Sequence, residues 1–118
     1  MRKLIISILF GLLLLTSAGS QQSHAAVTLC FTNNASNIIY VRAFSANRNA
    51  VWPAGAHWVL DDRVERCATL ACNSGEKICY GGTNNARKYW GVGYNGNYGC
   101  PSCCGFCNNA TFRWNLTD

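Results

Sequence analysis

The chain has few of the residues on which most enzymes and nucleic-acid binders depend. It holds five acidic residues and two histidines, and beyond residue 26 the one histidine is His57. General acid–base catalysis needs such groups, so the inventory for a hydrolase is small. The ten basic residues are spread along the chain instead of forming a stripe, which argues against nucleic acid as a partner.

The sequence also has no apolar run long enough to span a membrane. The run over residues 4–15 falls short of the roughly 20 residues that a hydrocarbon core of about 30 Å requires. Arg2 and Lys3 precede it, and the small residues Ser23 and Ala25 favour cleavage after Ala25, as in a secretory signal peptide. We assign residues 1–26 to the signal peptide and residues 27–118 to one domain, secreted or periplasmic and without a membrane span after cleavage.

Cysteine, by contrast, is abundant. The chain has eight cysteines, and four of them lie within residues 100–107. A small exported domain is expected to form disulfides, because burial alone gives it only marginal stability. We therefore expect mainly structural disulfides among Cys30, Cys67, Cys72, Cys79, Cys100, Cys103, Cys104 and Cys107.

The pairing of these cysteines stays open. Adjacent cysteines rarely bond each other, so Cys103 and Cys104 should have different partners. One attractive pattern joins each cysteine of the 100–107 cluster to one of the four earlier cysteines, but spacing alone does not select it.

Two other chemistries compete for the cluster. Its two C-x-x-C pairs have the ligand type of a zinc or copper site, although four-cysteine zinc ribbons separate such pairs by about 15–20 residues and here the pairs adjoin. The segment Cys100-Pro101-Ser102-Cys103 has the spacing of a thiol-exchange pair but lacks the βαβ context. We expect no cofactor and no resident metal.

The remaining pattern is that of an all-β domain. Residues 27–32 and 110–117 alternate apolar and polar side chains, which is the period of a half-buried strand. Residues 38–45 are rich in β-formers and are expected to pair with the first strand as a hairpin. Further short strands are expected at residues 51–55, 56–60, 63–70, 77–80 and 87–95, with a helical alternative for 63–70.

Asparagine and glycine turns separate these segments, and Asn95-Gly96 is the dipeptide most favoured for a tight hairpin turn. About seven short strands at intervals of roughly 8–12 residues are typical of sandwiches and small barrels. The sequence therefore predicts a small antiparallel β-sandwich or barrel stapled by disulfides.

Three segments in the first half carry a resemblance to a known family: Phe31-Thr32-Asn33-Asn34, Ile39-Tyr40-Val41 and Pro53-Ala54-Gly55-Ala56-His57-Trp58-Val59-Leu60. They resemble the opening strands of thaumatin-like β-sandwich proteins. The resemblance covers about a third of the chain and implies a β-sandwich. It implies no activity, because the second half departs from that family and no acidic cleft residues match. The whole chain is also similar to small, secreted, cysteine-rich bacterial β-proteins of unknown function.

Residues 87–98 form the candidate binding surface. In a strand, Trp90 and Tyr94 share one face while Tyr89 and the glycines share the other. The glycines then open a channel beside Tyr89 that admits a flat ligand such as a sugar ring. In the alternative interpretation the glycines accommodate a neighbouring aromatic ring, and Trp90 and Tyr94 belong to the core. The expected binding residues are Arg87, Lys88, Tyr89, Asn95, Asn97 and Tyr98.

The leading functional hypothesis is a non-enzymatic domain that binds a glycan or a protein at the cell envelope or outside the cell, with its oligomeric state open. One alternative is a small secreted hydrolase or ribonuclease-like toxin, with His57 and Glu65 as an acid–base pair and Arg63 or Arg66 as an anion clamp. Another is an envelope metal-binding protein that uses the cluster from Cys100 to Cys107.

Overall fold

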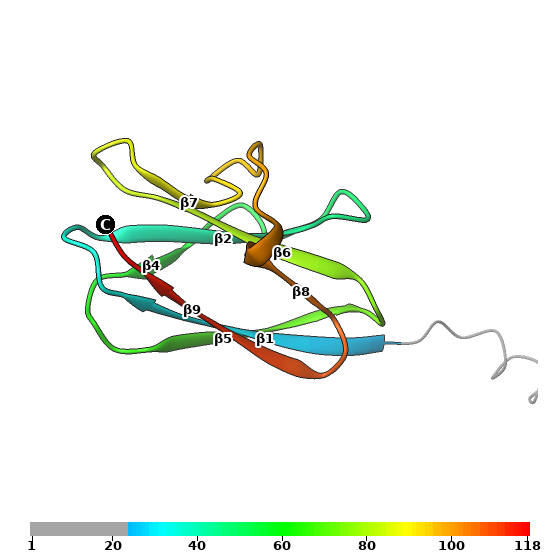
Figure 1. Ribbon diagram of the computed structural model, residues 1–118. Coiled ribbons are helices and arrows are strands. Elements are labelled where there is room, and N and C mark those ends of the chain that lie inside the picture. Colours follow the sequence, from blue (N-terminus) through cyan, green and yellow to red (C-terminus); the bar gives the residue numbers. More distant parts are fainter. Residues whose placement is uncertain (1–23) are drawn as a thin grey trace, which may run out of the picture.

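The computed structural model describes residues 24–118, so most of the expected signal peptide lies outside the described residues. Within that range the chain forms two β-sheets that lie one above the other (Figure 1). The elements are β1 (His24–Asn33), β2 (Ile39–Ser45), β3 (Val51–Trp52), β4 (Trp58–Leu60), β5 (Arg66–Asn73), β6 (Lys77–Thr83), β7 (Tyr89–Gly91), the short 3₁₀ turn η1 (Pro101–Cys103), β8 (Cys104–Phe106) and β9 (Ala110–Leu116).

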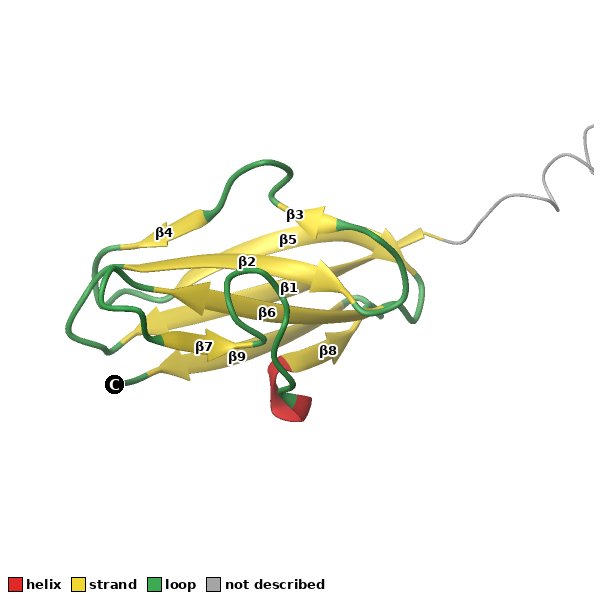
Figure 2. Ribbon diagram, turned by 90° about the horizontal axis from the view of Figure 1, so that it is seen from above, coloured by secondary structure: helices red, strands yellow, loops and turns green. Residues whose placement is uncertain are grey.

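Sheet A has the strand order β5-β1-β9, and sheet B has the order β3-β2-β6-β7 with β4 beside β2 and β8 beside β6 (Figure 2). The predicted all-β class is confirmed, and the architecture is the sandwich. Most pairs are antiparallel, but β1 and β9 run parallel. No helix within residues 24–118 has the length and apolar character needed to cross a membrane.

The core lies between the sheets and follows from the period of two in the strands. Val27, Leu29 and Phe31 of β1 are buried, and alternate residues of β2 are buried opposite them. Phe31 also contacts the ring of Trp114 at a centroid distance of 5.7 Å and that of Tyr80, across the sandwich, at 5.2 Å. These contacts join β1 and β9 of sheet A to β6 of sheet B.

The expected hairpin between the first two strands is wrong. β1 pairs with β5 and β9, and β2 pairs with β3, β4 and β6 in the other sheet. The buried side chain of Asn33 turns the chain between the sheets: its Nδ2 donates to the carbonyls of Asn37 and Leu60 at 2.9 Å each, and its Oδ1 accepts from the amide of Ala35 at 2.8 Å. Two strands with one apolar face each therefore pack face to face instead of edge to edge.

The strand assignment for residues 63–70 is confirmed over the helical alternative, since β5 covers most of that segment. The chain at the expected cleavage point is also part of a strand. β1 begins at His24, and residues 24–26 pair with the end of β5. Cleavage after Ala25 stays a prediction, and it leaves Ala26 bonded to Asn109 through both their backbone and the Asn109 side chain.

The disulfide interpretation of the cysteines is confirmed. All eight cysteines of the described chain are paired, so the 100–107 cluster offers no free thiolate for a metal. Cys103 and Cys104 do have different partners, as expected. The four bonds are Cys30–Cys67, Cys72–Cys107, Cys79–Cys104 and Cys100–Cys103.

The pattern that joined every cluster cysteine to an earlier one is wrong for two of the four bonds. Cys30 and Cys67 face each other in the register of β1 and β5, with their Cα atoms 4.0 Å apart. Cys100 is the N-cap of η1 and Cys103 is its last residue, a spacing of i and i+3 that places their side chains on the same side of a 3₁₀ turn. Local geometry therefore selects these two pairs.

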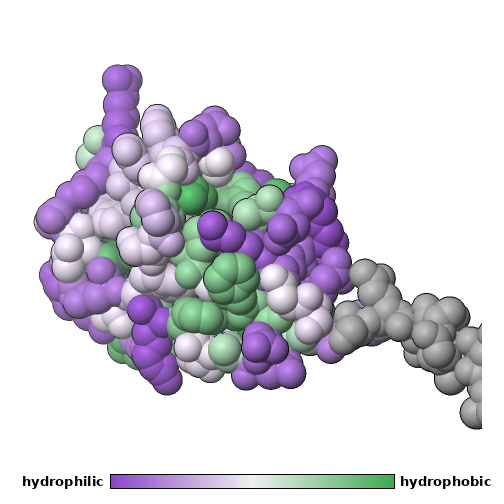
Figure 3. Space-filling view, turned by 45° about the vertical axis from the view of Figure 1, so that its right-hand side comes forward, coloured by the Kyte–Doolittle hydropathy of each residue, from purple (hydrophilic) through white to green (hydrophobic). Residues whose placement is uncertain are grey.

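Large apolar side chains remain exposed outside the core. Figure 3 shows apolar atoms gathered near the centre of one face with hydrophilic residues around them. The exposed large apolar side chains of the described chain are Ile38, Val59, Val64, Tyr89, Tyr98 and Phe106.

Candidate functional site

The candidate surface is built where the chain leaves β7. Gly91 and Gly93 have φ angles of 63° and 81°, in the left-handed region that favours glycine. The strand expected over residues 87–95 therefore ends at Gly91, and the chain turns back. Asn95-Gly96 does lie in a turn, closed by a bond from the Gly96 amide to the Gly93 carbonyl, but this turn joins no pair of strands.

Residues 92–99, which we call the 92–99 loop, lie across the outer face of sheet B (Figure 2). A β-carbon on Gly81 of β6 would come 1.8 Å from the Gly93 carbonyl oxygen, so the loop rests directly on the strand. The Val92 amide donates to the Tyr80 carbonyl at 2.9 Å, and the Tyr98 amide to the Val92 carbonyl at 3.0 Å. Glycine at position 81 is thus a requirement of this packing.

The channel expected beside Tyr89 is absent from the described structure because protein fills it. The ring of Tyr98 lies against Gly93, where a β-carbon would come within 2.5 Å of Cδ2. Trp90 is buried, and its Nε1 donates to the Thr117 carbonyl at 2.8 Å. The alternative interpretation is therefore right for the glycines and for Trp90 but wrong for Tyr94, which is only partly buried and bonds His57.

Tyr89 and Tyr98 nevertheless form a surface together. Their rings are stacked with centroids 4.1 Å apart and planes 13° apart, and the two residues are 48% and 54% exposed. Stacking holds each ring in place while leaving about half of it in solvent. The structure thus brings together two aromatic residues that the sequence placed nine positions apart.

The other four predicted binding residues are close in sequence to Tyr89 or Tyr98. Arg87 and Lys88 are exposed just before β7. The loop that carries them is held by buried Asn84, whose Oδ1 accepts from the amide of Lys88 at 3.0 Å. Asn95 and Asn97 are exposed on the 92–99 loop.

The side of the 92–99 loop that faces β2 carries a second group of residues, which we call the Arg42 pocket. It is a hollow of about 300 Å³ lined by Arg42, Gly55, Ala56, His57 and Tyr94. His57 Nδ1 and the Tyr94 hydroxyl are hydrogen-bonded at 2.7 Å. The imidazole also packs on Tyr40 at a centroid distance of 4.8 Å.

Sequence reasoning missed Arg42 and Tyr94 as site residues. The alternation in residues 38–45 does place Tyr40, Arg42 and Phe44 on the outer face of β2. Nothing local to β2, however, shows that a loop some fifty residues later covers that face. The strand predicted over residues 87–95 includes Tyr94, but the left-handed glycines end that strand at Gly91.

His57 and Glu65, the proposed acid–base pair, have different neighbours in the structure and make no contact with each other among those described. His57 packs among the tyrosines of sheet B, whereas a Glu65 carboxylate oxygen lies 3.9 Å from Nε of Arg113 in β9. Glu65 also lies near Cys30 and Cys67 with ligand atoms within 4.8 Å, but those two sulfurs are bonded to each other. Arg66, one of the two suggested anion clamps, is paired with Asp62.

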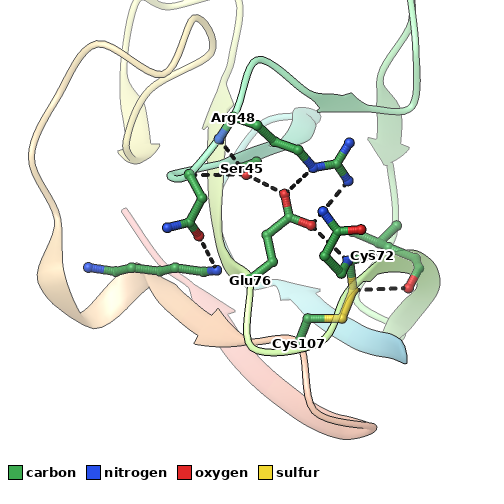
Figure 4. A network of polar contacts seen from close by, with 9 residues as sticks. Ser45, Arg48, Cys72, Glu76 and Cys107 are labelled. Atoms are coloured by element: carbon green, nitrogen blue, oxygen red, sulfur yellow. Dashed lines mark hydrogen bonds and ion pairs between the residues drawn. A yellow bond between two sulfur atoms is a disulfide. The ribbon is translucent and has the colours of Figure 1, made fainter. Parts of the chain in front are cut away.

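A different carboxylate, that of Glu76, is the most completely bonded polar group near the other end of sheet B (Figure 4). Its side chain is 2% exposed. Arg48 donates to both of its oxygens, Nε at 2.5 Å and Nη2 at 3.1 Å. The Ser45 hydroxyl and the Asn73 amide, at 2.5 and 2.9 Å, complete the shell. The hydrogen bond from Arg48 is the main cause that lowers the pKa of Glu76 to about 2.

This shell fastens segments that are distant in sequence. The Cys107 amide donates to the Glu76 carbonyl at 2.7 Å, and the Gly75 amide donates to the Cys107 carbonyl at 2.6 Å. The bond between Cys72 and Cys107 lies beside it in Figure 4. Each polar group of Glu76 is hydrogen-bonded within the protein, so this network supports the fold.

No protein-family model, no curated protein and no solved structure matches the chain.

Proposed function

We propose that the chain is an exported, non-enzymatic binding domain that recognises a glycan at the cell envelope or outside the cell. The observation that carries the proposal is the stacked pair of Tyr89 and Tyr98, each about half exposed. Aromatic rings are the usual partners of the apolar faces of sugar rings, and a ring already held in place loses little freedom when a ligand binds. The four disulfides fit an oxidising compartment.

Polar groups around the pair supply the directional part of recognition. Arg87 and Lys88 lie exposed next to Tyr89, and Asn95 and Asn97 lie exposed on the loop that carries Tyr98. Their amide and cationic groups donate hydrogen bonds to hydroxyl or carboxylate oxygens. A combination of ring face and amide donors is what an oligosaccharide needs, because each sugar offers both C–H and O–H groups.

The test is a glycan-array screen of the disulfide-bonded protein, followed by affinity measurements on the best oligosaccharide. Tyr89→Ala and Tyr98→Ala should each weaken binding about fivefold, since stacking against an aromatic ring contributes on the order of 1 kcal/mol. Phe106→Ala is the matched control, because Phe106 is 57% exposed outside the surface. Unchanged binding in both tyrosine variants refutes the assignment, as does a partner captured through this surface that proves to be a protein.

A further inference from the structure

The Arg42 pocket contains a partly buried cation that has no acidic partner and a buried nitrogen without a hydrogen bond. We infer that it binds the carboxylate of an acidic sugar, that is, of a uronic acid. This inference deepens the proposed function, because it names the class of glycan, and it rests on that function for the claim that the sugar belongs to an oligosaccharide.

The unsatisfied nitrogen of its side chain singles out Arg42 among the described residues. Its guanidinium lies 5.0 Å from the Tyr94 ring centroid and 5.5 Å from that of Phe44. Nη1 donates to the Tyr94 carbonyl at 3.3 Å, while Nε is buried without a hydrogen-bond partner. Three other arginines are paired with acids: Arg48 with Glu76, Arg66 with Asp62 and Arg113 with Glu65. Arg63 and Arg87 have no ion pair either, but both are exposed to water, whereas Arg42 is partly buried.

A half-buried guanidinium without an acid is costly to the free protein and favourable to an anion. The two aromatic rings remove water from Arg42 and compensate its charge only in part. An oxyanion that reaches the open edge of the guanidinium restores both the charge and the hydrogen bonds that water gave. The lining residues of the pocket include no acidic side chain, so nothing in the pocket repels that anion.

The remaining walls of the pocket indicate a sugar and not a bare anion. A hollow of about 300 Å³ is at the lower end of the range for small-molecule sites, roughly 300–1,000 Å³, and exceeds what a small inorganic ion fills. The imidazole of His57 and the ring of Tyr94, with centroids 5.8 Å apart, give it aromatic walls. The Tyr94 hydroxyl bonds His57 Nδ1 at 2.7 Å and keeps capacity for a further hydrogen bond to a sugar hydroxyl.

The position of the pocket links it to the stacked tyrosines. Tyr94 and Tyr98 are on the same 92–99 loop, the first directed to His57 and Arg42 and the second to Tyr89. The loop rests on β6 through Gly81. An acidic oligosaccharide that crosses this loop places one unit on the tyrosine stack and the carboxylate of another beside Arg42.

The test uses small probes that do not depend on the stacked tyrosines. Glucuronate, methyl glucoside as a neutral sugar and inorganic sulfate are titrated separately into isotope-labelled protein, with the Arg42 Nε–H and His57 ring signals followed by NMR. We expect saturable shifts, with glucuronate binding at least tenfold tighter than either of the other probes. Read from the His57 ring signals, Arg42→Gln should abolish the shifts and Arg42→Lys should weaken them because lysine lacks the planar fork. Arg63→Gln, a matched loss of one exposed cation, should leave them unchanged.

The outcomes separate this inference from the proposed function. Tyr89→Ala should retain glucuronate binding in the pocket while losing the oligosaccharide. Glucuronate that binds equally well to Arg42→Gln overturns the inference, and so does sulfate that binds as tightly as glucuronate, since that result denies a role to the sugar. If the oligosaccharide binds through the tyrosines but its carboxyl-reduced form binds equally well, the proposed function stands and the inference fails.

Discussion

Two arginines of sheet B and its loops show how the same side chain is used in two ways. Arg48 donates to both oxygens of a buried carboxylate whose remaining partners are a hydroxyl and a backbone amide. Arg42 lies between two rings with one backbone acceptor and no acid. A charge that is fully matched within the chain stabilises the fold, whereas a charge left unmatched at an open hollow favours a ligand.

The surroundings of the two arginines differ in the same sense. The Glu76 network is tied to the end of β5 by the bond between Cys72 and Cys107. One wall of the Arg42 pocket is formed by the 92–99 loop, which rests on the sheet through Gly81 and a few backbone hydrogen bonds. The first region should therefore dominate stability and the second should dominate binding, and the predictions below are ordered by the size of their expected effects.

Loss of the bond between Cys72 and Cys107 should have the largest effect. The two cysteines are 35 residues apart in sequence, and closing a loop of that length contributes about 4 kcal/mol in the chain-entropy model. The double variant Cys72→Ser, Cys107→Ser should lose an amount of this order in denaturant unfolding. The matched double variant Cys100→Ser, Cys103→Ser opens a loop with a separation of only 3 and should lose about half as much. Equal losses contradict the account.

Glu76→Gln should destabilise the domain by roughly 2–3 kcal/mol at neutral pH, because hydrogen bonds to a charged group are worth more than neutral ones. The native pKa of Glu76 is about 2, below its ordinary value of 4.5. The stabilisation is therefore complete above about pH 4.5 and is lost as the pH falls toward 2. Unfolding free energies measured across this range should fall steeply in the wild type and much less in the variant. Parallel pH profiles refute the assignment.

Gly81→Ala should displace the 92–99 loop, because a β-carbon there overlaps the Gly93 carbonyl. We expect a loss of about 1–3 kcal/mol, as for other overpacked positions, together with loss of both binding surfaces. Gly99→Ala is the control, since a β-carbon at Gly99 meets nothing within 4 Å. Contacts between the two rings can be read by NMR. If the Gly81 variant keeps the Tyr89–Tyr98 contact, the loop has not been displaced and the prediction is wrong.

The fold class was predictable because it depends on patterns that are local in the sequence. The alternation in residues 110–117 gives β9, and the β-rich segment 38–45 gives β2. The sheet to which a strand belongs is not local. β1 and β2 both have one apolar face, which is equally consistent with pairing edge to edge and with packing face to face, and the Asn33 hydrogen bonds decide between them.

The candidate site was predictable in part for the same reason. Tyr89 and Tyr98 stood out as aromatic residues among glycines and asparagines, but their stacking depends on the left-handed turns at Gly91 and Gly93. Arg42 gave no local signal, because what makes it unusual is its partial burial beside a distant loop with no acidic neighbour. The disulfide pairing likewise required the register of β1 with β5.

The most direct test of the contrast between the two arginines is the free energy of unfolding of Arg48→Gln and Arg42→Gln, each measured with and without glucuronate at ten times its wild-type Kd. The account predicts that Arg48→Gln is clearly less stable than the wild type yet still gains about 1.4 kcal/mol from glucuronate, as the wild type does. Arg42→Gln should remain within about 0.5 kcal/mol of the wild type and gain nothing from glucuronate. An Arg42→Gln protein that is as destabilised as Arg48→Gln, or that is still stabilised by glucuronate, contradicts it.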